Sequence, residues 1–173
     1  MKVNIEKFNM KSVKAFFSER KKLFLMCLCV FFLSNFILSH IMIIFHDSIN
    51  YNFAWIYKKN NILSSDIKKG EYAFFTVIHP FENKEVQLIK KVGCDENDFL
   101  TVNENKEYFC NDSFIGKAKD KAKNGETVKF FSFNGKIPEG HFFFVGSHPD
   151  SYDSRYYGFY KKEDILGLAH PLF

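Results

Sequence analysis

The stretch GSHPDSYDSRYYG, residues Gly146–Gly158, carries more information about this chain than any other. It places Ser151, Asp153, Ser154 and Arg155 close together, between a phenylalanine-rich segment and a second glycine. On an extended segment, side chains two residues apart point to the same side, so the carboxylate and the guanidinium can pair through charge-assisted hydrogen bonds. Such a pair fixes the local backbone, and the two hydroxyls beside it can orient a neighbouring group. Taken alone, the stretch is also compatible with a polar surface turn that contains an incidental ion pair.

The segments before this stretch have the pattern of short strands separated by turns. They read YNFAWIYKK, YAFFTVI, QLIKKVG, FLTV, YFC, VKFFSF (residues 128–133) and HFFFVG. The lysine-rich segment GKAKDKAKNGE between two of them is predicted to be a solvated loop. Short strands at even spacing, without a helical period, predict an all-β sheet or a partly open barrel. The sequence contains neither a G-x-S-x-G elbow nor a glycine-rich phosphate loop.

Composition limits the chain to a few classes of protein. Its 173 residues have room for one domain and an appendage. Hydrophobic residues make up 46%, and the four prolines and nine glycines are too few for a disordered or collagen-like chain. The net charge of +4 is modest, and the basic residues are enriched in the N-terminal arm. We therefore predict no nucleic-acid partner.

A long apolar run near the N-terminus predicts a transmembrane helix. Residues Leu23–Phe45, LFLMCLCVFFLSNFILSHIMIIF, include no Asp, Glu, Lys or Arg. At ~1.5 Å per residue the run reaches ~35 Å, enough to cross a bilayer. A cleaved signal peptide is the alternative. The run is longer than the usual ~7–15-residue apolar region of a signal peptide, and no small-x-small cleavage site follows it. We therefore predict an uncleaved signal anchor.

The charges before the run predict its orientation. The basic residues there outnumber the two acidic ones, Glu6 and Glu19; they are Lys2, Lys7, Lys11, Lys14, Arg20, Lys21 and Lys22. The positive-inside rule then places the N-terminus in the cytoplasm. The predicted organisation is a cytoplasmic basic arm at residues 1–22, a transmembrane anchor at 23–45 and an extracytoplasmic domain at 46–173.

The cysteines predict a disulfide rather than a metal site. Cys94 and Cys110 flank a strand–turn–strand pattern, and a bond between them is expected if this part lies outside the cytoplasm. Two free, half-buried thiols are the alternative. Neither this pair nor Cys27 and Cys29 has zinc-site spacing with histidine partners. We predict no metal and no cofactor.

Three separated residues are candidates for nucleophilic catalysis. Ser48 follows the apolar run, Lys90 lies in a largely apolar strand, and Ser151 lies in the C-terminal stretch. A serine becomes a nucleophile when a base removes its proton, and a lysine is such a base when burial lowers its pKa. Taken singly, a serine after a membrane helix is an interfacial cap residue, and Lys90 with Lys91 is a pair of snorkelling side chains. Spacing does not choose between these interpretations.

In order and context, these segments resemble the type I signal peptidase family of membrane-anchored Ser–Lys proteases, and most of all its conjugative-transfer, TraF-type branch. The resemblance covers residues 45–173. GSHPDSYDSRYYGFYKKEDILGLAHPL matches the G-x-(N/H)-x-x-S-x-D-S-R-x-x-G box of the family and the I-x-G-x-A that follows it. LIKKVG resembles the K-R-V-x-G box, KKGEYAFF the K-x-G-D-x-V-x-F strand, and IPEGHFFFVG the turn and strand before the last box.

The resemblance implies a role for each candidate residue. Ser48 would be the nucleophile, Lys90 the general base and Ser151 the group that orients the lysine, with Asp153 and Arg155 as a structural ion pair.

The serine box departs from the family pattern. Asn50 stands where the conjugative branch has the proline of S-(L/V/I)-P, and His46 stands where a serine or threonine often helps to form the oxyanion hole. The backbone N–H of Ser48 would be one oxyanion donor, and the imidazole N–H of His46 would be the other.

The function implied by the resemblance is that of a serine endopeptidase that cleaves leader peptides. Its expected partners are the bilayer, a propilin or other leader-peptide-bearing substrate, and subunits of a conjugative or type IV secretion system. Its expected place is the inner (cytoplasmic) membrane, with a single pass and a periplasmic catalytic domain. Two alternatives stay open: a non-catalytic assembly subunit, favoured by the departures at His46 and Asn50, and the housekeeping leader peptidase, which usually has a longer chain.

Overall fold

The computed structural model describes residues 10–44, 51–58, 67–78 and 83–172, with side chains from Ser18 onward. The chain divides into two compact units, Met1–His40 and Ile41–Phe173, and each is described here by itself.

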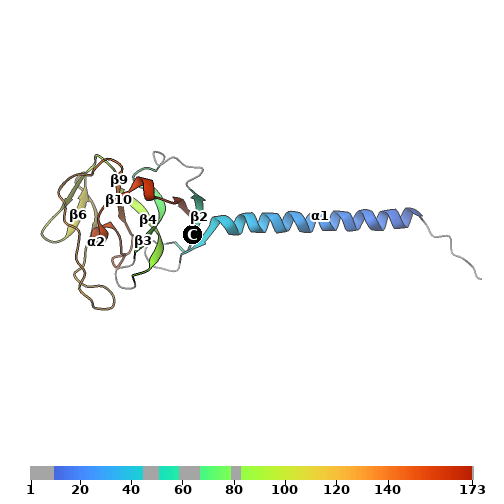
Figure 1. The fold of residues 1–173 in the computed structure, drawn as a ribbon, viewed down its shortest axis with the longest axis horizontal. Helices are drawn as coiled ribbons and strands as arrows, with labels where there is room; N and C mark the ends of the chain where they lie inside the picture. Colours follow the sequence, from blue (N-terminus) through green and yellow to red (C-terminus); the bar gives the residue numbers. More distant parts are fainter. Residues whose placement is uncertain (1–9, 45–50, 59–66, 79–82, 173) are drawn as a thin grey trace, which may run out of the picture. The chain divides into compact units, whose positions relative to one another are not determined.

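The first unit contains one long helix. Helix α1 spans Met10–His40 without a break at the predicted end of the basic arm (Figure 1). Its part from Ser18 to His40 has a mean hydropathy of 2.1 and is long and apolar enough to cross a membrane. The apolar side chains along it are exposed, with Leu38 at 73%, as expected of a helix that has lipid as its solvent. Two of its polar side chains, Ser34 and Asn35, donate hydrogen bonds to the carbonyl oxygen of Phe31.

The helix ends earlier than the apolar run does. Residues Ile41–Ile43 form strand β1, which pairs with strand β2, Phe53–Lys58. The helix therefore ends before the predicted anchor 23–45 does, and the residues after His40 pair as a strand, which suits their branched side chains. Phe45 lies outside the described residues.

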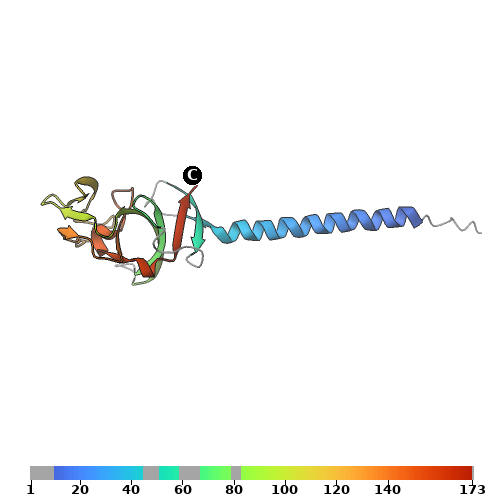
Figure 2. The same cartoon turned by 90° about the horizontal axis from the view of Figure 1, so that it is seen from above.

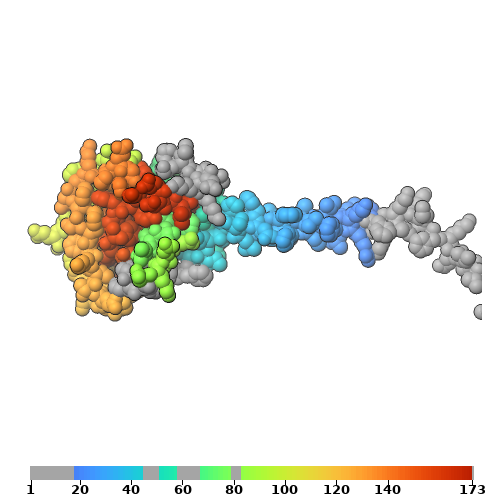
Figure 3. Space-filling view, in the orientation of Figure 1, coloured from blue at the N-terminus to red at the C-terminus, as the bar shows by residue number. Residues whose placement is uncertain are grey.

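The second unit is built around a seven-stranded sheet whose neighbours are all antiparallel. Its strand order is β1-β2-β11-β3-β4-β9-β10. The further strands of this sheet are β3 (Tyr72–Ile78), β4 (Glu85–Cys94), β9 (His141–Val145), β10 (Tyr160–Lys161) and β11 (Gly167–Pro171). Figure 2 shows that the green strands β3 and β4 curve toward the orange-red C-terminal strands, so that the sheet forms a partly open barrel. On the face drawn in Figure 3, these two parts of the chain lie side by side.

A smaller sheet packs against the end of this barrel. Its order is β7-β6-β5-β8, with β5 at Phe99–Val102, β6 at Glu107–Cys110, β7 at Ser113–Lys117 and β8 at Gly135–Lys136. Two short helices complete the unit, α2 at Ser154–Tyr157 and η3 at Lys162–Asp164. The predicted mainly β fold behind one N-terminal apolar helix is confirmed.

The prediction of a strand at residues 128–133 is wrong. These residues belong to no strand, because the backbone hydrogen bond of Phe131 is made with α2 and not with a neighbouring strand. The N–H of Phe131 donates to the carbonyl oxygen of Arg155 at 2.7 Å, and the hydroxyl of Tyr108 donates to the carbonyl oxygen of Phe131. The segment thus packs as a loop against α2.

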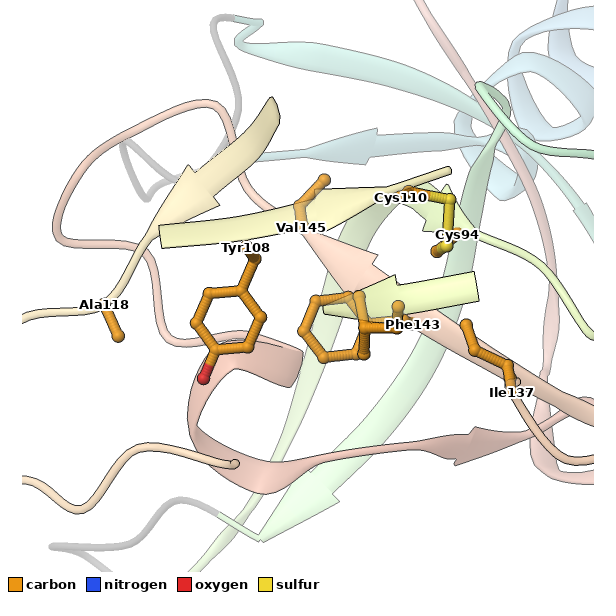
Figure 4. Packing of buried hydrophobic residues seen from close by; sticks show 8 residues of the cluster. Cys94, Tyr108, Cys110, Ala118, Ile137, Phe143 and Val145 are labelled. Atoms are coloured by element: carbon orange, nitrogen blue, oxygen red, sulfur yellow. A yellow bond between two sulfur atoms is a disulfide. The ribbon is translucent and has the colours of Figure 1, made fainter. Parts of the chain in front are cut away.

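Aromatic side chains fill both cores. Inside the barrel, Phe75 and Phe144 stack with ring centroids 4.4 Å apart. Between the barrel and the smaller sheet, Tyr108 stacks on Phe143 at 5.4 Å, next to a disulfide between the two sheets (Figure 4). These two clusters adjoin along β4 and β9, whereas other phenylalanines, such as Phe31 of α1, are exposed.

Candidate active site

Strand β4 carries a buried lysine toward the C-terminal stretch. Lys90 lies opposite Ala73 of β3 and has no exposed surface, whereas its neighbour Lys91 is exposed. Successive side chains of a strand point to opposite faces of the sheet, so Lys90 and Lys91 point in opposite directions. The Nζ atom of Lys90 donates a hydrogen bond to the Oγ atom of Ser151 at 2.7 Å.

Burial changes the acid–base chemistry of this lysine. Loss of hydration lowers the pKa of Lys90 from 10.5 to about 8. The carboxylate of Asp153 opposes this shift, and the guanidinium of Arg155 adds to it. A substantial fraction of the amine is therefore neutral slightly above neutral pH, and a neutral amine can accept a proton.

A buried ion pair between Asp153 and Arg155 holds the C-terminal stretch in its conformation. Asp153 is the N-cap of α2, and both of its carboxylate oxygens bind Arg155, at 2.8 Å to Nε and 2.7 Å to Nη2. The same carboxylate accepts the N–H of Gly146 at 2.7 Å, while the Nη1 of Arg155 donates to the carbonyl oxygen of Lys117 at 2.7 Å. Both charges are buried, at 0% and 3% exposure. The pair thus ties the loop before α2 to β7 and to the end of β9.

Ser154 has a function that the sequence did not reveal. Its Oγ atom accepts the backbone N–H of Phe144 at 2.9 Å, and the side chain is fully buried. This bond attaches α2 to β9, which in turn pairs with β4. The adjacent serines therefore differ: Ser151 contacts the lysine, and Ser154 supports the helix. In the sequence, only the resemblance to the family box separates the two, since it gives Ser151 the role of orienting the lysine.

The two candidate residues before β2 lie outside the described residues. Ser48 and His46 fall in the connection between β1 and β2, so the structure does not bring them to Lys90 or keep them from it. At the ends of this connection, the N–H of Ile44 donates to the carbonyl oxygen of Asn52 at 2.8 Å.

The strand that carries Lys90 has a free edge. Strand β4 pairs with β3 over Glu85–Lys91 but with β9 only over Lys91–Cys94. Within the described part of the chain, the β9 side of residues 85–90 therefore has no strand partner. The unpaired N–H and C=O groups of such an edge can bind an extended peptide. This free edge ends at Lys90.

Cys94 and Cys110 form a disulfide, with Cα atoms 5.6 Å apart. Cys94 follows Lys90 on β4, and Cys110 lies on β6, so the bond joins the two sheets (Figure 4). Asp98 is close enough to both sulfurs for a three-residue metal site. The sulfurs are joined to each other, however, and only free thiolates bind metals well.

Two comparisons with known proteins found matches for this chain. A family model described as signal peptidase, peptidase S26, matches residues 18–173. Among the solved structures that match is the crystal structure of a signal peptidase I from Enterococcus faecalis V583. It has 20% sequence identity and a TM-score of 0.37, over 58% of this chain and 94% of that chain. A search of curated proteins found no match.

Proposed function

Since the chain belongs to the S26 family of signal peptidases, which are serine hydrolases, we propose that Ser48 is its nucleophile and Lys90 its general base. The observation that carries this proposal is the buried lysine, whose pKa is lowered to about 8 and whose Nζ atom is 2.7 Å from Ser151. A lysine in a purely structural role would keep its ammonium in water or pair it with a carboxylate.

In the proposed reaction, the Oγ atom of Ser48 attacks the carbonyl carbon of a substrate peptide bond. The neutral amine of Lys90 accepts the hydroxyl proton, and the hydroxyl of Ser151 holds that amine in place. The C–N bond then breaks, and the ammonium of Lys90 returns the proton to the leaving amine. A water molecule attacks the acyl-enzyme and gives its proton to Lys90, which then reprotonates Ser48. The backbone N–H of Ser48 and the ring N–H of His46 would stabilise the oxyanion.

The free edge of β4 is the proposed binding place of the substrate backbone. An extended peptide that pairs with residues 85–90 would reach Lys90 at the end of the edge. Backbone hydrogen bonds along a strand align a peptide largely independently of its sequence, which suits an enzyme that cleaves many leader peptides.

Helix α1 supports membrane anchoring, because its part from Ser18 to His40 is apolar and long enough to span a bilayer. The basic residues from Lys2 to Lys22, which precede the apolar run from Leu23, favour a cytoplasmic N-terminus and an extracytoplasmic second unit, single-pass in the inner membrane. The disulfide between Cys94 and Cys110 supports the same orientation, since such bonds persist in oxidising compartments.

The finer proposal is maturation of a propilin for a conjugative or type IV secretion system. It rests on the likeness of the Ser151–Arg155 box to the TraF-type branch. A housekeeping leader peptidase would act by the same chemistry on many secreted precursors. The departures at His46 and Asn50 favour a third role, as a non-catalytic assembly subunit.

Cleavage of a leader-peptide substrate by the full chain in detergent tests the peptidase proposal. We expect Ser48→Ala and Lys90→Met each to lower the rate by at least about 10²–10⁴-fold with unchanged far-ultraviolet circular dichroism. Ser132→Ala and Lys136→Met, at exposed positions, are the matched controls. Full activity of Ser48→Ala would transfer the nucleophile assignment to Ser64 or Ser65, which also lie outside the described residues.

The range of substrates separates the three roles. Cleavage of a propilin but not of general secretory precursors supports the conjugative role, and the intact mass of the product shows whether it is linear or has lost one water by cyclisation. Cleavage of neither by the wild-type protein, with the chain folded, would support the assembly role.

A further inference from the structure

A cleft rich in basic side chains lies beyond Lys90 along β4. It has a volume of 590 Å³ and opens between β4 and β7, with residues 145–149 along its wall. Five basic side chains line it: Lys69, Lys91, Lys117, His148 and Arg155. Of these, Arg155 is paired with the buried Asp153, and His148 lies 3.8 Å from Asp150. Among its lining residues in the described part of the chain there is no carboxylate. We call it the cationic cleft.

The lysines of the cationic cleft differ in how far their charge is neutralised. Lys91 is exposed and forms no ion pair with any residue that the structure describes. Lys69 and Lys117 each have a carboxylate at longer range, 3.6 Å from Asp98 and 3.4 Å from Glu107, and their side chains stay 42% and 55% exposed. The positive charges of these three lysines are thus only partly neutralised by nearby carboxylates, and such a surface attracts anions.

Apolar walls make the cationic cleft suitable for a side chain rather than for a free ion. Val92, Val145, Ile115 and the 61% exposed Phe114 line it. Gly93 closes the wall without a side chain, since a Cβ atom there would lie 2.8 Å from a methyl carbon of Val145. A side chain with an aliphatic stem and a charged end fits this combination of surfaces.

The cationic cleft is continuous with the candidate active site. Strand β4 supplies both Lys90 and Lys91, and the wall segment Gly146–Pro149 leads directly into Ser151. At about 3.3 Å per residue, Gly93 lies roughly 10 Å beyond Lys90 along the strand. A peptide on the free edge of β4 meets the end of β9 at Lys91, where Val145 pairs. Its continuation must leave the sheet along residues 146–149, which line the cleft.

We propose that the cationic cleft is an extended subsite that binds an acidic side chain of the substrate within a few residues of the scissile bond. This inference rests on the proposed peptidase function, and it adds a charge preference to it. The continuity with the free edge favours a segment of the substrate polypeptide over a lipid headgroup as the occupant.

The test compares peptide substrates that differ only in one charge. Glutamate and glutamine are exchanged in turn at each of several positions on both sides of the scissile bond, and kcat/KM is measured with the full chain in a non-ionic detergent. We expect a glutamate preference of about fivefold at one or two adjacent positions, which decreases at high salt. Lys91→Gln should lower that preference about threefold. Lys136→Gln, at the opposite edge of the smaller sheet, should not change it.

Two results would overturn the subsite. One is equal rates for glutamate and glutamine at every position; the other is a preference that Lys91→Gln leaves intact. A headgroup site would show no glutamate preference in detergent, but a Lys91-dependent gain of activity in nanodiscs that contain anionic lipid, and this would also overturn the proposal.

Binding separates this inference from the peptidase function. If no peptide is cleaved, fluorescence anisotropy of labelled glutamate and glutamine peptides still measures the charge preference and its dependence on Lys91. A preference without cleavage keeps the subsite and removes the peptidase; cleavage without a preference does the reverse.

Discussion

The Nζ atom of Lys90 lies 2.7 Å from the Oγ atom of Ser151, although the two residues are 61 positions apart in the sequence. Strand β4 brings the lysine, and the loop before α2 brings the serine. Two supports fix this contact: the buried pair of Asp153 and Arg155 below the loop, and the bond from Phe144 to Ser154. The result is an oriented amine whose pKa burial lowers to about 8.

The pH dependence of activity should report Lys90. Because its pKa is lowered to about 8, kcat/KM should rise with pH through this value and level off above it. A kcat/KM profile of the full chain measures the acidic limb. A limb centred near pH 6, where a histidine titrates, would contradict the assignment.

Stability should depend on Lys90 in a defined pH window. Between pH 8 and 10.5 the unfolded chain keeps a proton that the folded chain has lost, so the stability of the folded state rises with pH. The full gain is about 3 kcal/mol. Urea unfolding below and above this window should show the gain in the wild-type protein and lose it in Lys90→Met. The exposed variant Lys136→Met is the control.

Removal of the hydroxyl beside the lysine should lower kcat rather than raise KM. Ser151→Ala deletes the hydrogen-bond acceptor of Lys90, and a base without its support loses about 10–100-fold in rate. Ser151→Thr keeps the hydroxyl and should restore part of the rate. An effect on KM alone would mean that Ser151 contacts substrate instead of the lysine.

Loss of the buried ion pair should destabilise the protein more than it impairs the chemistry. Arg155→Ala leaves the carboxylate of Asp153 buried without its partner, which typically costs about 3–5 kcal/mol. Lys161→Ala, which breaks the exposed pair with Glu163, should cost less than about 1 kcal/mol. Melting temperature and rate per folded molecule are measured together. An unchanged melting temperature with no activity would place Arg155 in the catalytic machinery.

The disulfide should stabilise the second unit by about 2–4 kcal/mol. The bond between Cys94 and Cys110 closes a loop, which lowers the conformational entropy of the unfolded chain. Replacement of both cysteines by serine should remove this amount in urea unfolding. The matching replacement of Cys27 and Cys29, which are free in α1, should not. Protein isolated under alkylating conditions should gain two hydrogens on reduction; an unchanged intact mass would contradict the bond.

Much of the fold could be predicted from local patterns. The apolar run predicts a long helix, and the alternating phenylalanine-rich segments predict strands, because both signals depend on neighbours a few residues apart. The end of α1 at His40 was not predictable in this way. Ile41–Ile43 are as apolar as the helix before them, and their pairing with Phe53–Trp55 decides their conformation.

From the sequence alone, the pairing of Asp153 with Arg155 could be predicted, because the two residues are close together in the chain. The extended segment expected there is instead the start of α2, in which Asp153 is the N-cap and Arg155 lies in the first turn. The sequence also determined which residue types the C-terminal stretch presents. The family resemblance implied the roles of Lys90 and Ser151. Only the tertiary structure shows that Lys90 is buried and Lys91 exposed, that Ser151 contacts the lysine while Ser154 binds Phe144, and that a charged cleft follows β4. The physical reason is that burial, and with it the lowered pKa of the lysine, depends on strand order and register, which bring together residues far apart in the chain.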